Sequence, residues 1–297
     1  MNNITLNTNM KALFYEDINK FYDLAFPFLL NHEIENGLLL VILNSLKRNI
    51  HRYGEDQPLL LTLTKRNNIK LITIRTPPYD LLISYTDELD IIEILVEYLF
   101  KRKEKLPGVL GFKEAADKFA RLWCKKSNLD SYLLRNERVF KLEEVSEDTL
   151  GINKFHVATK EYEKIVLKWA REMLKEALSD ITKKELDRNI NNFKEEFESN
   201  NSQIFLLFDD NEPVSMARKA GKSPNGNAIN LVYTPPSLRR RGYATECVAK
   251  LSKVLLEEGN NYCFLFTDLS NPTSNSIYQK IGYRPVIDEN HYKFKTK

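Results

Sequence analysis

The chain alternates between segments with helical and strand-like spacing of hydrophobic residues. Apolar residues at helical spacing between about residues 15 and 50 predict two opening helices. Three runs rich in apolar or β-branched residues, bounded by turn formers, predict strands at Leu59–Thr64, Ile69–Ile74 and Leu81–Ser84. The rest of the first half is predicted as a helix with Asp87 and Glu88 in its first turn, a short apolar segment at 109–112, a helix near 115–123 and a strand at 132–142.

The second half repeats this order of predicted elements. Two helices between about 160 and 200 precede strands at Gln203–Phe208, Pro213–Ala217 and Ile229–Tyr233, with a hairpin turn at Asp209–Glu212. A helix at 243–258, a strand at 263–267, a helix at 273–281 and a final strand follow. The mixed order predicts an α/β (α+β) fold of two similar lobes. The charged stretch Lys141–Asp148 places their boundary near residue 150, which gives domains 1–150 and 151–297.

The tripeptide Thr-Pro-Pro occurs in both halves, at Thr76–Pro78 and Thr234–Pro236. Each copy ends a predicted strand, and the agreement of order suggests that the lobes are related. The alternative is that the same tripeptide ends two strands by chance. Only the second copy continues into arginines and a glycine, so a phosphate site is expected in the second lobe alone.

Composition limits the classes of function. The chain has 297 residues, 42% of them hydrophobic, and its formal net charge of +3 is too small for the whole molecule to bind nucleic acid electrostatically. The three cysteines, Cys124, Cys247 and Cys263, are far apart, which predicts buried reduced thiols and no metal site. The N-terminus lacks the pattern of a signal peptide, and no apolar run approaches membrane length, so we expect a cytoplasmic protein.

One stretch of the second half has the chemistry of an anion-binding turn. Arg239–Thr245 runs from three arginines through Gly242 into a helical pattern. The first turn of a helix carries free backbone N–H groups and the positive end of the macrodipole. Gly242 and Ala244 have little or no side chain, so a phosphate can approach the main chain closely. The stretch therefore suits a pyrophosphate.

Two alternatives apply to the same arginines. Taken alone, an arginine run is more often a solvated turn than a binding site. A nucleic-acid patch would carry more basic residues with interleaved aromatic residues, and basic residues become sparse after Arg241. Neither a Walker loop nor a dinucleotide-binding glycine fingerprint is present in the sequence.

Two motifs in the second half resemble those of the GNAT (GCN5-related) N-acetyltransferase superfamily. Arg239-x-x-Gly242-x-Ala244 is similar to its acetyl-CoA motif, and Asn271, followed seven residues later by Tyr278 and then by Gly282-Tyr283, is similar to its second segment. The sequence of residues 233–242 resembles that of the GNAT branch with an FR47-like C-terminal domain. The resemblance covers about residues 155–297, and the first half matches only in the order of elements. It implies an acyl-CoA N-acyltransferase fold with a mixed, mostly antiparallel sheet flanked by helices.

The resemblance also implies roles for individual residues. The backbone of the strand residues would pair with the pantetheine arm of acetyl-CoA, the turn would bind its pyrophosphate, an asparagine would contact coenzyme A, and a tyrosine would protonate the departing thiolate. The strand residues are Leu231, Val232 and Tyr233, the asparagine is Asn271, and the tyrosine is Tyr278. The residues of the turn are Arg239, Arg240, Arg241, Gly242, Tyr243, Ala244 and Thr245.

The implied reaction is direct attack of a primary amine on the thioester, through a tetrahedral oxyanion that a strand N–H near Tyr233 could stabilise. A base must accept the proton of the ammonium. Where certain relatives place a glutamate this chain has Phe266, and the nearest acid is Asp268, which is a candidate base or an ordinary loop carboxylate. His156 and His291 have no evident partners in the sequence and receive no role.

The expected partners are acetyl-CoA and an amine acceptor, with no metal, nucleic acid or membrane, in a monomer or homodimer. A catalytically idle acyl-CoA-binding or regulatory module is the alternative function, although the complete second motif with Tyr278 argues against idleness. RNA binding through the three arginines is a third hypothesis, and the sequence gives it little support. No segment of the sequence identifies the acceptor.

Overall fold

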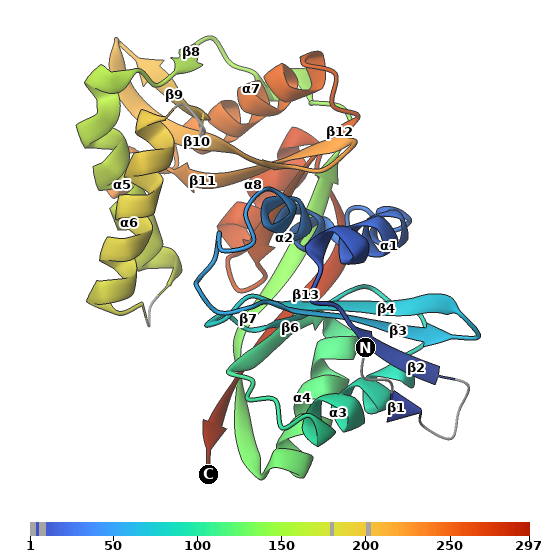
Figure 1. The fold of residues 1–297 in the computed structure, drawn as a ribbon. Helices are drawn as coiled ribbons and strands as arrows, with labels where there is room; N and C mark the ends of the chain where they lie inside the picture. The colour runs from blue at the N-terminus through green and yellow to red at the C-terminus, as the bar shows by residue number, and fades with distance from the viewer. Residues whose placement is uncertain (1–3, 6–9, 179–180, 200–202) are drawn as a thin grey trace. The chain divides into compact units, whose positions relative to one another are not determined.

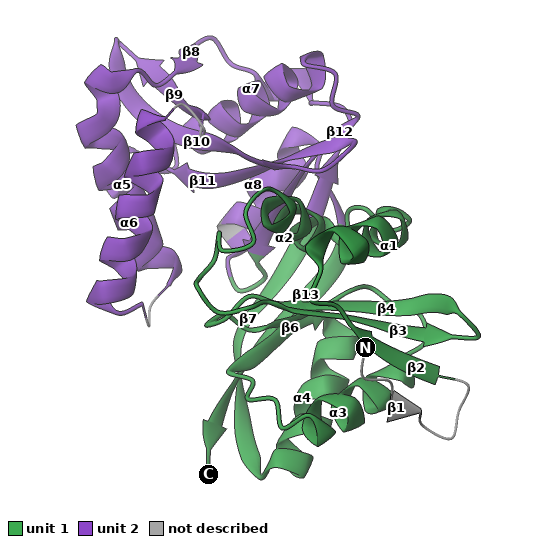
Figure 2. Cartoon of the chain, viewed as in Figure 1, with its two compact units in different colours: residues 1–139, 268–270, 286–297 green, residues 140–267, 271–285 purple. Residues whose placement is uncertain are grey.

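The chain forms two compact units, which Figure 2 shows in green and purple. A computed structural model describes residues 4–5, 10–178, 181–199 and 203–297. Unit 1 comprises residues 1–139, 268–270 and 286–297, and unit 2 comprises 140–267 and 271–285. The predicted domains divided the chain once, near residue 150. The compact units differ from that division because the last part of the chain returns to unit 1.

Unit 1 is a sheet with helices on both faces. Its strands follow the order β1-β2-β3-β4-β5-β6-β13-β7, and β5 and β6 pair in parallel. The elements of the first half of the chain (Figure 1) are β1 Ile4–Thr5, β2 Met10–Phe14, α1 Ile18–Leu30, α2 Gly37–Arg48, β3 Leu59–Lys65, β4 Asn68–Arg75, β5 Leu81–Ile83, α3 Ile91–Lys101, β6 Gly108–Phe112, α4 Lys113–Ser127 and β7 Leu129–Leu142.

Unit 2 has the same kind of architecture. Its strands follow the order β12-β11-β10-β9-β8, and β11 and β12 pair in parallel. The remaining elements are η1 Glu147–Thr149, β8 Lys154–Val157, η2 Lys160–Tyr162, α5 Glu163–Ala177, α6 Lys183–Glu198, β9 Gln203–Asp209, β10 Glu212–Lys222, β11 Gly226–Tyr233, η3 Pro236–Leu238, α7 Tyr243–Glu257, β12 Tyr262–Asp268, α8 Pro272–Ile281 and β13 Arg284–Thr296.

The two halves of the chain repeat one order of elements, which confirms the predicted pair of similar lobes. β2-α1-α2-β3-β4-β5-α3-β6-α4-β7 matches β8-α5-α6-β9-β10-β11-α7-β12-α8-β13, and most strand pairs are antiparallel. Corresponding hairpins even share a turn with two left-handed residues, Arg66–Asn67 between β3 and β4 and Asp210–Asn211 between β9 and β10. The predicted hairpin at 209–212 is confirmed. The short opening strands β2 and β8 were missed in the sequence.

The last strands of the two lobes depart from a simple repeat. β13 ends the second lobe, yet its residues Glu289–Lys293 pair antiparallel with β6 in unit 1. β7 ends the first lobe, yet its residues 140–142 belong to unit 2. Each unit therefore includes part of the strand that closes the other half of the chain.

The two Thr-Pro-Pro copies do not occupy equivalent positions, so this part of the repeat hypothesis was wrong. Thr76–Pro78 lies between β4 and β5, whereas Thr234–Pro236 follows β11, the counterpart of β5. In the first lobe the true counterpart of the arginine turn is the segment 84–90 between β5 and α3. That segment carries Asp87, Glu88 and Asp90 and no glycine, so its charge would repel a pyrophosphate.

Four hydrophobic clusters fill the two faces of each sheet. In unit 1 one cluster includes α1 and α2 and another includes α3 and α4. In unit 2 one includes α5 and α6 and another includes α7 and α8. Cys247 and Cys263 are buried as free thiols, as predicted, whereas Cys124 is only half-buried. Among the described residues, no helix combines the length and the hydrophobicity needed to cross a bilayer.

Helix α3 corrects a smaller prediction. Asp87 and Glu88 precede the helix, which begins at Ile91 and has Glu93 in its first turn. Glu88 instead forms ion pairs with Lys65 and Lys70, at 3.1 and 2.6 Å.

Candidate active site

Strands β11 and β12 pair over only part of their length. Their parallel register runs through Gly226, Asn227 and Ala228 of β11. From residue 229 to 233, β11 has no register partner on β12 in the described chain. A β-bulge lies in the same stretch, because the β10–β11 register shifts there and Leu231 has a left-handed φ of 49°. The bulge and the short register leave backbone N–H and C=O groups of β11 available to an extended ligand.

The side chains of this stretch anchor β11 on both faces. Leu231 and Tyr233 pack against the cluster of α5 and α6, and Val232 packs against the cluster of α7 and α8. The Tyr233 hydroxyl donates to Glu172 on α5 at 3.0 Å. Burial, followed by the hydrogen bond to Glu172, raises the pKa of Tyr233 to about 12. Tyr233 is therefore a structural anchor with its proton in place.

The arginine turn joins β11 to α7, and its first arginine is already engaged. The Arg239 Nε donates to the backbone oxygen of Thr234 at 2.9 Å. Its Nη2 contacts both carboxylate oxygens of Glu176 on α5, at 2.7 and 2.9 Å. The guanidinium also lies 5.6 Å from the centre of the Tyr233 ring. These contacts fix the turn to α5. Arg240 and Arg241 are exposed.

Helix α7 begins without a side-chain cap. Gly242 is its N-cap, with a left-handed φ of 88°, and no side chain accepts a hydrogen bond from the first turn. A Cβ built on Gly242 would have no heavy atom within 4 Å. The backbone N–H groups of Tyr243, Ala244 and Thr245 lie in the first turn, where the helix has no carbonyl group to accept their hydrogen bonds. This open, positively polarised turn fits an anion such as a pyrophosphate.

A buried carboxylate holds the same helix from its other side. Glu246 is 8% exposed and accepts from the Asn153 backbone N and Nδ2, both at 2.8 Å. Lys250, one turn later, lies 3.0 Å from its carboxylate. A Cβ on Gly151 would lie 2.3 Å from the Glu246 Cδ, so only glycine fits there. The start of α7 is thereby fixed by groups that leave its N-terminal N–H groups open.

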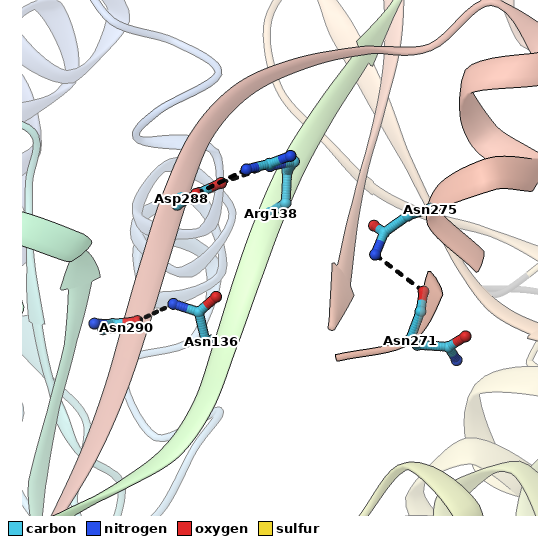
Figure 3. A network of polar contacts seen from close by, with 6 residues as sticks. All are labelled: Asn136, Arg138, Asn271, Asn275, Asp288 and Asn290. Carbon is cyan, nitrogen blue, oxygen red and sulfur yellow. Dashed lines mark hydrogen bonds and ion pairs between the residues drawn. The ribbon is translucent and has the colours of Figure 1, made fainter. Parts of the chain in front are cut away.

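Helix α8 carries the two residues of the second motif. Asn271 is its N-cap, and the Asn271 Oδ1 accepts from the Ser274 backbone N at 3.1 Å. The Asn275 Nδ2 donates back to the Asn271 backbone oxygen at 2.9 Å, as Figure 3 shows. The Asn271 side chain thus has a structural role in addition to the coenzyme A contact that the resemblance implies.

Tyr278 lies inside unit 2, in the cluster of α7 and α8. It is 8% exposed, and its ring centre lies 6.3 Å from that of Phe140 and 5.9 Å from that of Tyr283. Burial alone raises the pKa of Tyr278 to about 12. By contrast, the Tyr283 hydroxyl lies 2.8 Å from the Ser252 Oγ. Val232 and Tyr243 pack against the same cluster, which connects Tyr278 to β11 and to the start of α7.

Asn271→Ala should separate capping from ligand contact. Loss of the cap should lower the free energy of unfolding by about 1 kcal/mol, since one orphan N–H of α8 loses its acceptor. Asn271→Asp keeps an acceptor at the cap and should retain most of that stability in urea denaturation. Equal destabilisation by both substitutions would contradict the capping role.

Asp268, the candidate base, lies at the end of β12 and is exposed. Its Oδ1 accepts from the Ser270 backbone N at 2.7 Å. It belongs to unit 1, whereas Tyr278 belongs to unit 2. Its role as a base stays a prediction.

Sequence reasoning assigned no partner to His291, which pairs with Asp80 in the structure. The His291 Nε2 lies 2.5 Å from the Asp80 Oδ2, and Lys293 contacts the same carboxylate at 2.8 Å. Burial acts to raise the pKa of Asp80, but hydrogen bonds from His291 and Lys293 bring it below its usual value. Asp80 and His291 are 211 residues apart, so no local pattern could connect them.

Comparisons with known proteins relate the chain to acetyltransferases in part of its sequence and in its fold. The acetyltransferase (GNAT) family model matches residues 166–283. No curated protein is significantly similar to the chain in sequence. Among solved structures, a GCN5-related N-acetyltransferase from Sphaerobacter thermophilus is 13% identical, with a TM-score of 0.59 over 98% of this chain and 97% of that one.

Two further solved structures are similar. A Drosophila protein is 12% identical, with a TM-score of 0.60 over 97% of this chain and 99% of that one. A GNAT-family acetyltransferase from Colwellia psychrerythraea is also 12% identical, with a TM-score of 0.53 over 86% and 97% of the two chains. At these identities the likeness establishes the fold. The family match separately marks residues 166–283 as a GNAT acetyltransferase domain.

Proposed function

We propose that the protein transfers the acetyl group of acetyl-CoA to a primary amine. The observation that carries this proposal is the uncapped start of α7 at Gly242, which lies within the matched domain and follows the stretch of β11 that has no register partner on β12 in the described chain. The pyrophosphate of acetyl-CoA would accept from the N–H groups of Tyr243 to Thr245, with Arg240 and Arg241 adding charge. The pantetheine arm would pair with the backbone of Leu231 to Tyr233.

In the proposed reaction, the neutral amine attacks the thioester carbon, the C–N bond forms, and the C–S bond breaks. A backbone N–H near Tyr233 would stabilise the negative charge on the carbonyl oxygen. Tyr278 would donate its proton to the departing thiolate. Asp268 remains the candidate for accepting the proton of the amine.

Gly242→Ala tests the phosphate site. The methyl group would enter the open space above the first turn of α7, so we expect acetyl-CoA affinity to fall about tenfold or more in calorimetry. The left-handed φ should also cost about 1 kcal/mol of stability.

Gly259 supplies a matched control at the other end of the same helix. Its φ is 90°, and a Cβ there would also meet nothing within 4 Å. Gly259→Ala should therefore cost similar stability and leave acetyl-CoA affinity unchanged. An equal loss of affinity in both variants would exclude the turn at Gly242 as the phosphate site.

Turnover decides between an enzyme and an idle binding module. Thiol release should depend on acetyl-CoA together with a panel of primary amines. Stabilisation by acetyl-CoA without any thiol release across the panel would instead favour the binding module.

A further inference from the structure

Strands β7 and β13 place two carboxylates on one face of unit 1. On the opposite face, Arg138 and Asn136 of β7 contact Asp288 and Asn290 of β13, as Figure 3 shows. The Arg138 Nε lies 2.7 Å from the Asp288 Oδ1. Because side chains alternate along a strand, Glu137 and Glu289 lie on the other face of this strand pair.

Glu289 is the unusual member of this pair. It is 6% exposed, and in the described ranges no hydrogen bond or ion pair is made by its carboxylate. The Asn136–Asn290 and Arg138–Asp288 contacts flank Glu137 and Glu289, so these two side chains are cross-strand neighbours. Burying a carboxylate without a counter-charge is costly, and a group of this kind marks a candidate functional site.

Glu137 links the pair to solvent and to other charges. It is half-buried and, in the described chain, has no ion pair of its own. The charged groups that act on it are Arg135, His291 and Asp268. Nearby on β13, the charge of Lys293 is satisfied by Asp80, as described above. Among these groups Arg135 is the one permanent positive charge, because His291 is engaged with Asp80.

The chain also connects this pair to the acetyltransferase motifs. The backbone oxygen of Asn136, next to Glu137, accepts from the Leu269 backbone N at 2.9 Å. Leu269 lies two residues before Asn271, the cap of α8. The Glu137 strand therefore holds the turn that leads into the second motif.

We propose that the Glu137–Glu289 pair binds an organic ammonium group. An ammonium donates up to three hydrogen bonds and carries one charge, which suits two facing carboxylates beside one arginine. A divalent metal would need more ligands, and no group of three or more His, Cys, Asp or Glu in the described ranges is arranged to hold one.

Methylammonium chloride is a direct probe, measured by calorimetry against potassium chloride at equal ionic strength. Burial, followed by repulsion from Glu137, raises the pKa of Glu289 to about 8. Binding must then release a proton below that pH, so affinity should rise about tenfold per pH unit up to about pH 8 and level off above it. A purely structural carboxylate would show no such dependence.

Glu289→Gln and Glu137→Gln should abolish methylammonium binding, with acetyl-CoA affinity retained. Glu114→Gln, an exposed glutamate in the first turn of α4, is the charge-matched control and should change neither. Equal binding by wild type and Glu289→Gln, or equal binding of potassium, would overturn the proposal.

The two proposals fail in different ways. If the wild type does not bind acetyl-CoA but still binds methylammonium through Glu289, the acetyltransferase function is excluded and the ammonium site is retained. If amines are acetylated but Glu289→Gln binds methylammonium as tightly as the wild type does, the ammonium site is excluded and the acetyltransferase function is retained.

Discussion

Tyr278→Phe should lower the rate of acetyl transfer by about 100-fold while leaving acetyl-CoA affinity unchanged. The substitution removes only the phenolic oxygen, which is the proposed proton donor, and general acids of this kind contribute roughly 10² to 10⁴ in rate. The ring stays in its cluster with Phe140 and Tyr283, so the fold should be retained. Single-turnover measurement of thiol release, beside calorimetry with acetyl-CoA, separates the two steps.

Tyr283→Phe is the matched control for that experiment. Tyr283 is equally buried and neighbours Tyr278, but its hydroxyl is engaged with Ser252. Its loss should cost about 1 kcal/mol of stability and little activity. Because the pKa of Tyr278 is about 12, the wild-type rate should show no alkaline decline from this group below about pH 11. Unchanged transfer in Tyr278→Phe would remove its assigned role.

Glu289→Gln should make the protein more stable at alkaline pH. The pKa of Glu289 rises from 4.5 to about 8 on folding, so the folded protein binds more protons than the unfolded chain between these values. The contribution of Glu289 to the free energy of unfolding of the wild type is fully present below about pH 4.5 and is lost as the pH rises through about 8. Glutamine mimics the protonated form, and the variant should gain on the order of 3 kcal/mol at pH 9.

Urea denaturation at pH 5 and at pH 9 checks this result. The difference between Glu289→Gln and wild type should be small at pH 5 and large at pH 9, whereas Glu114→Gln should show no such change. A difference that does not vary with pH would mean that Glu289 is ionised at no exceptional cost. That outcome would weaken the case for an ammonium site without touching the roles of Gly242 or Tyr278.

Most elements could be predicted because each carries a strong local signal. The amphipathic helices α4 and α7 and the apolar strands β3 and β9 have regular spacing, and the hairpin at Asp210–Asn211 has the expected turn residues. The short strands β2 and β8 carry too few residues for their pattern to stand out. The misplaced Thr-Pro-Pro equivalence arose because proline ends strands in many contexts.

The parts that could not be predicted depend on contacts between distant segments. The Asp80–His291 and Asn136–Leu269 contacts join residues with no local relation. The bulge at Leu231 has no glycine to mark it. Arg239 is the first residue of the acetyl-CoA motif, yet its guanidinium donates a hydrogen bond to Glu176 on α5. Sequence spacing could not indicate this partner. Local patterns specify elements, whereas burial and charge pairing depend on the assembled sheet.

The exchanged closing strands have a consequence for dividing the protein. A fragment that begins at residue 151 would include β13, most of which belongs to unit 1, and would lack the β7 residues that belong to unit 2. The complementary fragment, residues 1–150, would lack β13 and would include the β7 residues that belong to unit 2. A division of the protein that keeps both compact units whole therefore has to move the two closing strands together.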